Sequence, residues 1–210
     1  MGHRAWIQDL LRYGVGLGLF ANTIEEARDE VFTLISKLRA TSLLIDDCDN
    51  NYFDMHDLIR DVAVSITSRD CHGLLLTGDH VPKEWSDMEA MKVFEWIWLQ
   101  KANINELPDE FECPQLTFFC LVNKDPSLKI PADFFKGMQR LKVLDLTEMH
   151  LTSLPSSICL LKNLHTLSFY RCLLGEISVI GKMKNLEVLT ISSSDIKELP
   201  REIGELTQLK

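Results

Sequence analysis

The stretch LKVLDLTEMHLTSLP, residues 141–155, decides the fold because it recurs twice further along the chain. Its counterparts are LHTLSFYRCLLGEIS at 164–178 and LEVLTISSSDIKELP at 186–200. The first leucine of each copy, together with Leu209, marks a period of 23, 22 and 23 residues. Repeats of this length indicate a solenoid in which each unit adds one strand to a stack.

Two looser copies precede these repeats. They are VFEWIWLQKANINELP at 93–108 and LTFFCLVNKDPSLKIP at 116–131. The spacing L-x-x-L-x-L, closed by a proline-bearing turn, is the signature of a leucine-rich repeat. We therefore predict about five repeats over residues 91–210, with a parallel β-sheet on the concave face.

The residues between the leucines of each strand are expected to face outward from the concave sheet. Because aromatic and arginine side chains are enriched at the centres of interfaces, Tyr170 and Arg171 are the strongest candidates for contact with a protein partner. The outward acidic residues Asp145 and Glu148 are further candidates.

The first two strands carry apolar residues at the positions that we assign as outward. These are Phe94, Ile97, Leu99, Phe118 and Val122. Exposed apolar rows usually mark a covered surface. We expect this row to pack against residues 1–90 or against another neighbouring domain. The alternative is a register shift of one residue, which would turn the row into the core.

Residues 1–75 predict a small winged-helix-like α+β domain, and residues 76–90 a linker, so the whole chain is of α/β class. Thr23 and Glu26 form a candidate capping box before a helical apolar pattern. Residues 42–46 and 52–55 flank a polar turn and predict a hairpin, and a helix follows over 58–68.

Charge and composition exclude several classes. The net charge is −9, and residues 1–90 hold 8 basic against 16 acidic residues, a net of −8. This acidic half lacks the basic face that nucleic-acid binding needs.

The sequence has no apolar run of membrane-spanning length and no secretory signal, and its cysteines form no CxxC pair, so a cytoplasmic location is expected. No metal site is expected either, because the spacing of Cys159, His165 and Cys172 fits no standard zinc site. We predict that the chain is not an enzyme, because we find no nucleophile–base pair and no phosphate loop.

A histidine stands where the helix at 58–68 begins, and its role has two interpretations. A helix N-terminus favours anions, so Asp54 or Asp57 could act as a cap there. His56 could instead point outward and donate a hydrogen bond to a phosphate oxygen. The residues by themselves favour the capping interpretation.

The stretch FDMHDLIRDVAVSI resembles the methionine-histidine-aspartate motif of plant intracellular nucleotide-binding leucine-rich-repeat disease resistance proteins. DLLRYGVGLGLF at 9–20 and EEARDEVFTLISKLRATSLLID at 25–46 resemble the winged-helix part of the coiled-coil class of that family. The resemblance implies that His56 contacts a phosphate of ADP in the intact protein, with Met55 and Asp57 supporting the motif. It also implies ADP/ATP-dependent switching, autoinhibition and recognition of a pathogen effector or a guarded host protein. In the intact protein, the nucleotide-binding domain is then the alternative to residues 1–90 as the cover of the apolar row.

The sequence departs from that family in one respect. It contains no G-x-x-x-x-G-K-[ST] phosphate loop, since YGVGLGLF has no lysine after its glycines. We therefore expect a fragment that covers the winged-helix region and the first repeats, or a truncated gene model, with no cofactor for this fragment alone. The alternative is a plain leucine-rich-repeat scaffold for protein interactions without nucleotide switching.

Overall fold

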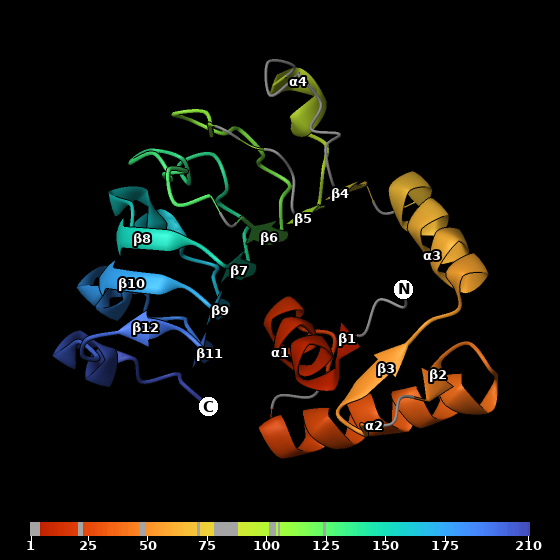
Figure 1. Cartoon of the computed structure of the whole chain (residues 1–210). Helices are drawn as coiled ribbons and strands as arrows, with labels where there is room; N and C mark the ends of the chain where they lie inside the picture. The colour runs from red at the N-terminus through yellow and green to blue at the C-terminus, as the bar shows by residue number, and fades with distance from the viewer. Residues whose placement is uncertain are drawn as a thin grey trace.

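The structure, a computed structural model, describes residues 5–20, 23–46, 49–70, 72–77, 88–100, 104, 106–123 and 125–210 of the 210-residue chain. A curved parallel sheet forms one side of the molecule, and a helical unit lies on its inner side (Figure 1). The sheet has six strands in the order β11-β9-β7-β6-β5-β4. Their bounds are β4 (Gly73–Thr77), β5 (Trp96–Gln100), β6 (Phe118–Val122), β7 (Val143–Thr147), β9 (Thr166–Tyr170) and β11 (Val188–Ser192).

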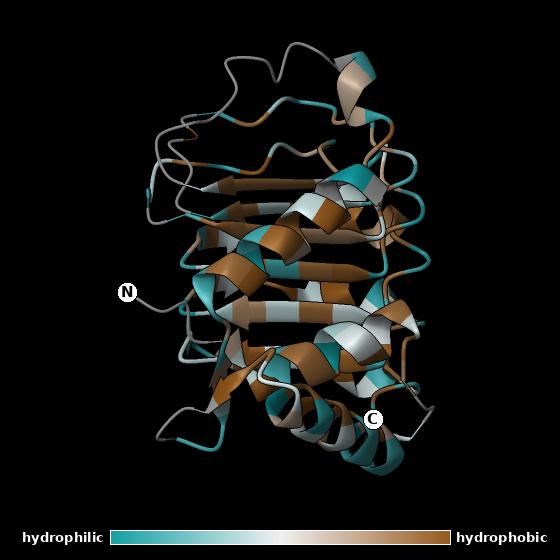
Figure 2. Ribbon diagram, turned by 90° about the vertical axis from the view of Figure 1, so that its right-hand side faces the viewer, coloured by the Kyte–Doolittle hydropathy of each residue, from teal (hydrophilic) through white to brown (hydrophobic). Residues whose placement is uncertain are grey.

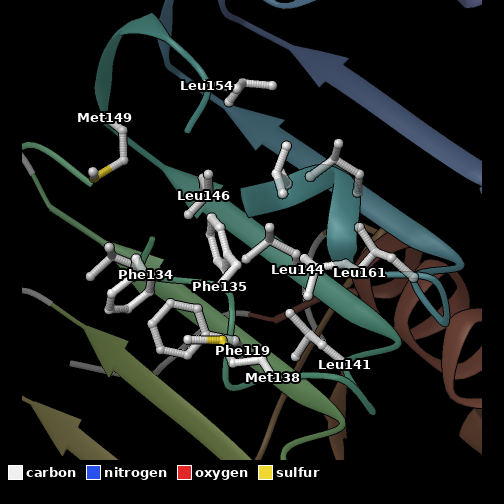
Figure 3. Packing of buried hydrophobic residues seen from close by; sticks show 14 of the residues in the cluster. Phe119, Phe134, Phe135, Met138, Leu141, Leu144, Leu146, Met149, Leu154 and Leu161 are labelled. Atoms are coloured by element: carbon white, nitrogen blue, oxygen red, sulfur yellow. The ribbon is translucent and has the colours of Figure 1, made fainter. Parts of the chain in front are cut away.

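The interior of the solenoid is filled by the regularly spaced leucines and by aromatic residues on the returning segments. Leu144 and Leu146 of β7 are fully buried and face Phe134 and Phe135, which precede that strand in sequence (Figure 3). Because successive side chains of a strand point to opposite faces, this interdigitation buries one face of β5, β6, β7 and β9, while the inward residues of β4 and β11 at the two ends are partly buried. A fully buried side chain of this size contributes about 1.5–3 kcal/mol, so the stack holds itself together.

The returning segments form a second, smaller layer that the sequence pattern did not specify. It consists of the parallel strands β8 (His150–Ser153), β10 (Leu173–Glu176) and β12 (Asp195–Ile196), in the order β12-β10-β8. Three 3₁₀ turns continue the same segments: η1 (Ser156–Leu160), η2 (Ser178–Lys182) and η3 (Arg201–Glu205). Pro155 and Pro200 stand directly before η1 and η3, where a fixed φ and a missing N–H cost nothing.

The N-terminal unit has its own core. It comprises β1 (Ala5–Trp6), α1 (Ile7–Leu17), α2 (Ile24–Ala40), β2 (Ile45–Asp46), β3 (Tyr52–Asp54) and α3 (Asp57–Asp70). The three short strands form an antiparallel sheet in the order β1-β3-β2, and α1 packs on α2 through Leu11, Val15 and Val31. Thr23 caps α2 as predicted, because the Glu26 N–H donates to Thr23 Oγ1 at 3.3 Å, and the Thr23 hydroxyl donates to Glu26 Oε2 at 2.8 Å.

The repeat sheet begins earlier than the predicted boundary at residue 91. Strand β4 pairs with β5 along its whole length, and Leu74 and Leu76 pack against the solenoid core. The predicted boundaries divide these residues between the helical domain, which ends at 75, and the linker, which begins at 76. That linker also contains a short helix, α4 (Met88–Met91), while residues 78–87 lie outside the described residues.

Candidate functional site

The register of β5 differs from the one predicted. Ile97 and Leu99 are fully buried in the solenoid core, and Phe94 packs against that core, so these three residues are not an outward row. Trp96 and Trp98 instead lie on the concave side, in a cluster with Phe118. The sequence left this ambiguous because VFEWIWL carries large apolar residues in both alternations. Gly73 makes room for the Trp96 indole, since a Cβ at that glycine would overlap the ring.

The apolar part of the concave face lies against α1. Phe118 and Val122 of β6 face the concave side and belong to a cluster that includes Tyr13 and Leu17 of α1. The Tyr13 ring meets Phe118 edge-on with centroids 5.1 Å apart, and it meets Trp98 edge-on at 6.5 Å. The helix therefore covers this part of the sheet through edge-on aromatic contacts as well as through burial of apolar surface.

A buried carboxylate holds the centre of this contact. Asp145 of β7 is 1% exposed and lies under α1. Its Oδ2 accepts hydrogen bonds from Tyr13 Oη at 2.7 Å and from the Arg12 guanidinium at 3.3 Å. Its Oδ1 accepts from Thr147 Oγ1 at 2.7 Å. Of these three donors, Arg12 and Tyr13 come from α1 and link the helix to the sheet, and Thr147 comes from the same strand.

The helix backbone approaches the strands closely. A Cβ at Gly16 would lie 2.7 Å from Val143 Cγ2 and would also overlap Thr166. The Thr166 hydroxyl donates to the Arg12 carbonyl at 2.9 Å, and Lys142 Nζ donates to the Leu17 carbonyl at 3.4 Å. These contacts place α1 in the hollow of the sheet, next to β7 and β9 (Figure 1).

Burial also perturbs the groups around Asp145. Asp9, one turn before Arg12 on α1, has its pKa raised to about 6, chiefly by desolvation and further by the charge of Asp145. Burial and the same carboxylate raise the pKa of the Tyr13 hydroxyl, so this residue stays neutral and donates. Burial likewise raises the pKa of the Cys120 thiol on β6. The site is thus a largely buried cluster in which the Arg12 guanidinium forms ion pairs with both Asp9 and Asp145.

Asp145 was a candidate for contact with an external protein, and the structure places it elsewhere. It is covered by the chain's own helix, because its three donors come from α1 and from its own strand. An external partner can reach this carboxylate only after α1 has moved away.

The other three candidates lie at the end of the strands, beside this contact. Glu148 and Arg171 each follow a strand by one residue and adopt φ values of 59° and 53°. The Arg171 guanidinium lies 5.1 Å from the centre of the Tyr170 ring and 3.6 Å from Glu148 Oε1. Their contact with a partner remains a prediction.

The histidine motif lies at the start of α3, away from this contact (Figure 1). His56 is exposed, and its carbonyl accepts the first helical hydrogen bond, from the Arg60 N–H, at 2.9 Å. Met55 packs against the core of the N-terminal unit, and Asp57 forms an ion pair with Arg60 at 3.0 Å. Asp54 accepts from the Met55 N–H at 2.7 Å, just before the helix.

The cysteines and the described helices bear on two further predictions. The Cys172 thiol is buried and donates to the Leu146 carbonyl at 3.1 Å. At the equivalent position one repeat later, the Ser194 hydroxyl donates to the Phe169 carbonyl at 3.4 Å. Within the described ranges, no group of three or more His, Cys, Asp or Glu side chains is arranged to hold a metal ion. Among the described helices, none combines the length and the apolar character needed to span a bilayer.

Sequence reasoning missed the α1 side of the contact. Asp9, Arg12 and Tyr13 stand in DLLRY, within a helix that otherwise contributes Ile7, Leu11 and Val15 to a core. No signal in the sequence links the two sides of the contact, because Arg12 and Tyr13 lie 133 and 132 residues from Asp145 and a polar residue is ordinary at that outward position of the repeat.

Comparison with known proteins gives a consistent set of relatives. No protein-family model matches the sequence. Disease resistance protein At4g27190 of Arabidopsis thaliana is 26% identical over 97% of this chain, which spans 22% of that relative. Probable disease resistance protein At1g12290 is 29% identical over 86%, and disease resistance protein RPS5 is 31% identical over 71%. The chain spans 21% and 17% of these two relatives, so it corresponds to about a fifth of each.

A leucine-rich-repeat protein of Leptospira interrogans is similar in structure with a TM-score of 0.37 and 22% sequence identity, covering 63% of this chain and 45% of that one. The repeat architecture described above rests on the strand order and register of the chain itself. The sequence relatives support a relation to plant disease resistance proteins.

Proposed function

We propose that this chain is the regulatory and sensing segment of a plant immune receptor that binds a nucleotide and carries leucine-rich repeats. The observation that carries the proposal is the seating of α1 on the concave face, where Arg12 and Tyr13 both contact Asp145. The resemblance of the sequence and the names of its relatives support the role in defence.

The seating of α1 accounts for a resting state. A concave repeat surface is a docking surface, and here its centre is occupied by the chain's own helix. Thr166 and Ser168 of β9, like Asp145, are buried. A partner that binds the centre of the sheet must therefore compete with α1, and partner binding would be coupled to release of the N-terminal unit.

The proposed nucleotide role concerns His56. The imidazole is exposed at the start of a 14-residue helix, where backbone N–H groups and the helix dipole favour an anion. The Asp57 charge next to it is paired with Arg60, which lessens its repulsion of a phosphate. These residues fit one phosphate contact of ADP in the intact protein. When bound, the nucleotide would supply negative charge at this helix end, while Met55 anchors the motif to the core beneath it.

Recognition of a pathogen effector or a guarded host protein is proposed for the strand-end residues. Arg171 stacks on Tyr170 and is more than half exposed, so both side chains present a preorganised surface. Glu148 orients the arginine from the neighbouring repeat. Replacing Arg171 with alanine would remove this stack without touching the α1 contact.

The test is made in an intact relative that carries this segment, expressed in leaf tissue, with cell death in the absence of a pathogen as the readout. Asp57→Val and Asp145→Asn should each raise this basal activity, the first through the nucleotide motif and the second through the α1 contact. Asp195→Asn, an exposed carboxylate on β12, is the matched control. Unchanged resting activity in both variants, at equal protein level, would favour the plain interaction scaffold.

A further inference from the structure

The contact between α1 and the sheet contains more carboxylates than cations. Arg12 Nη2 lies 2.8 Å from Asp9 Oδ1 and 3.3 Å from Asp145 Oδ2. The three groups carry one positive and two negative charges, a net of −1, at a contact where Arg12 and Asp145 are buried and the Asp9 side chain is 34% exposed. An unbalanced buried charge is costly, and uptake of one proton would neutralise it.

The two carboxylates are not equally well held. Both oxygens of Asp145 accept hydrogen bonds, from Tyr13, Arg12 and Thr147. Asp9 Oδ1 is buried and, within the described part of the chain, has no hydrogen-bond donor, because its approach to Arg12 lacks hydrogen-bond geometry. Asp9 is therefore the carboxylate that gains most from protonation.

We propose that Asp9, Arg12 and Asp145 form a proton-sensitive latch, in which protonation of Asp9 tightens the docking of α1 on the concave face. The biological consequence rests on the proposed function, since a tighter latch would hold the receptor in its resting state at acidic pH. The latch itself is a property of this chain.

The other titratable groups facing the latch do not oppose this behaviour. Tyr13 comes from the same helix, and its raised pKa keeps it protonated at all relevant pH values. Cys120 faces the cluster from β6, and its raised pKa keeps the thiol neutral. Of the charged partners, Arg12 from α1 opposes protonation of Asp9, and Asp145 from β7 favours it.

The sign of the pH effect follows from linkage. A carboxylic acid that binds its proton more tightly in the docked state stabilises docking at low pH, and this contribution is lost as the pH rises through the docked-state pKa. With the pKa of Asp9 raised from 3.8 to about 6, lowering the pH from 7 to 5 should favour docking by roughly tenfold.

The experiment uses the purified 210-residue chain. Hydrogen exchange of the α1 amides is measured between pH 5 and pH 7.5, corrected for the intrinsic exchange rate and compared with amides in the interior of β10. In the wild type, α1 protection should rise roughly tenfold from pH 7 to pH 5. Asp9→Asn should show at pH 7 the protection that the wild type reaches at pH 5, with no further pH dependence. Asp195→Asn should behave as the wild type.

A second measurement does not depend on exchange. A carbon-13 NMR titration of the Asp9 carboxyl should give a pKa near 6 in the wild type and a lower value in Asp145→Asn. Flat α1 protection, a pH dependence that persists in Asp9→Asn, or an Asp9 carboxyl that titrates at its ordinary value would each overturn the latch. None of these readouts involves nucleotide, partner or cell death, so their failure is separate from failure of the proposed function.

Discussion

Asp145 is the residue on which the arrangement of the two parts depends. It stands in a strand between two core leucines, at a position where the repeat pattern allows any outward residue. What gives it a role is the opposite surface, which supplies Arg12 and Tyr13. Exposed ion pairs contribute little, whereas removing one partner of a buried pair leaves the other charge without compensation.

Asp145→Asn should lower the free energy of unfolding by about 1–3 kcal/mol, because the hydrogen bonds that Tyr13 and Arg12 donate to the carboxylate are lost or weakened. The Arg12 charge itself stays compensated, because Asp9 still lies beside it. Urea denaturation of the 210-residue chain, followed by the fluorescence of its tryptophans, measures the change. A loss no larger than that of Asp195→Asn would mean that the buried pair adds nothing to stability.

Residue-level chemistry could be predicted only where it was local in sequence. Thr23 and Glu26 are three residues apart, and Thr23 caps the helix as expected by accepting from the Glu26 N–H. Arg12 and Asp145 are 133 residues apart, and no periodicity links them. The Asp9–Arg12 pair lies one helical turn apart and could be read from spacing, but its burial under the sheet could not.

At the scale of elements, the repeats with regular leucines were predicted well and the irregular ones were not. Strands β7, β9 and β11 start where the L-x-x-L-x-L spacing places them. The predicted register of β5 is wrong by one residue, because tryptophans occupy its outward positions and look like core residues. Strand β4 was not predicted. In that wrong register, the first leucine of its repeat would fall on Asp70. Hydrophobicity fixes a register only when one alternation is polar.

The docking of α1 depends on the absence of a side chain at Gly16. Gly16→Ala would stabilise an isolated helix by roughly 0.5–1 kcal/mol, because glycine is a poor helix former. In the docked helix the new methyl would meet Val143 and Thr166, whose side chains are held in the sheet. We expect the second effect to win, so this variant should lose α1 protection in hydrogen exchange.

The matched control for Gly16→Ala is Gly204→Ala, because a Cβ at Gly204 has no atom within 4 Å. This control should leave α1 protection unchanged. If Gly16→Ala raised α1 protection instead, the helix would have room to shift on the sheet, and the close approach would not be required for docking.

Helix α3 presents an apolar stripe that the sequence pattern assigned to a core. Leu58, Val62 and Ile66 are exposed, and Figure 2 shows apolar residues alternating with polar ones along this helix. Val62→Lys should therefore change the stability of this chain by no more than about 0.5 kcal/mol. Val31→Lys on α2 should abolish cooperative folding of the N-terminal unit, because Val31 is fully buried and lysine would carry a charge into the core.

Thermal unfolding followed by circular dichroism distinguishes these two variants. A large loss in Val62→Lys would show that the α3 stripe is covered in solution, and this would place the helix in a core as the sequence pattern suggested. The helical unit was predicted in outline, and its winged-helix nature stays a prediction. Its own sheet contains one strand more than the predicted hairpin, because β1 adds to β3.

At the scale of the whole molecule, the N-terminal unit and the repeat sheet meet through α1, and Val188 of β11 also packs against the core of that unit. Interfaces between the parts of one chain are commonly mobile unless they are large and apolar. Here the contact combines the close approach of the helix backbone at Gly16, the aromatic cluster around Tyr13, and the buried Arg12–Asp145 ion pair. Such a contact can hold one state and still be released by a modest change in free energy, as a switch requires.

The last prediction concerns nucleotide binding by the whole chain. His56 and the start of α3 offer ADP one exposed contact region, and the sequence has no glycine-rich phosphate loop with its lysine. Micromolar affinity requires about −8 kcal/mol, which one imidazole and one helix end do not supply. Calorimetry of the 210-residue chain with ADP and with ATP should therefore give no measurable heat of binding. Micromolar binding that disappears in His56→Ala would show that this segment forms a nucleotide site unaided, and binding unaffected by His56→Ala would move the site away from the motif.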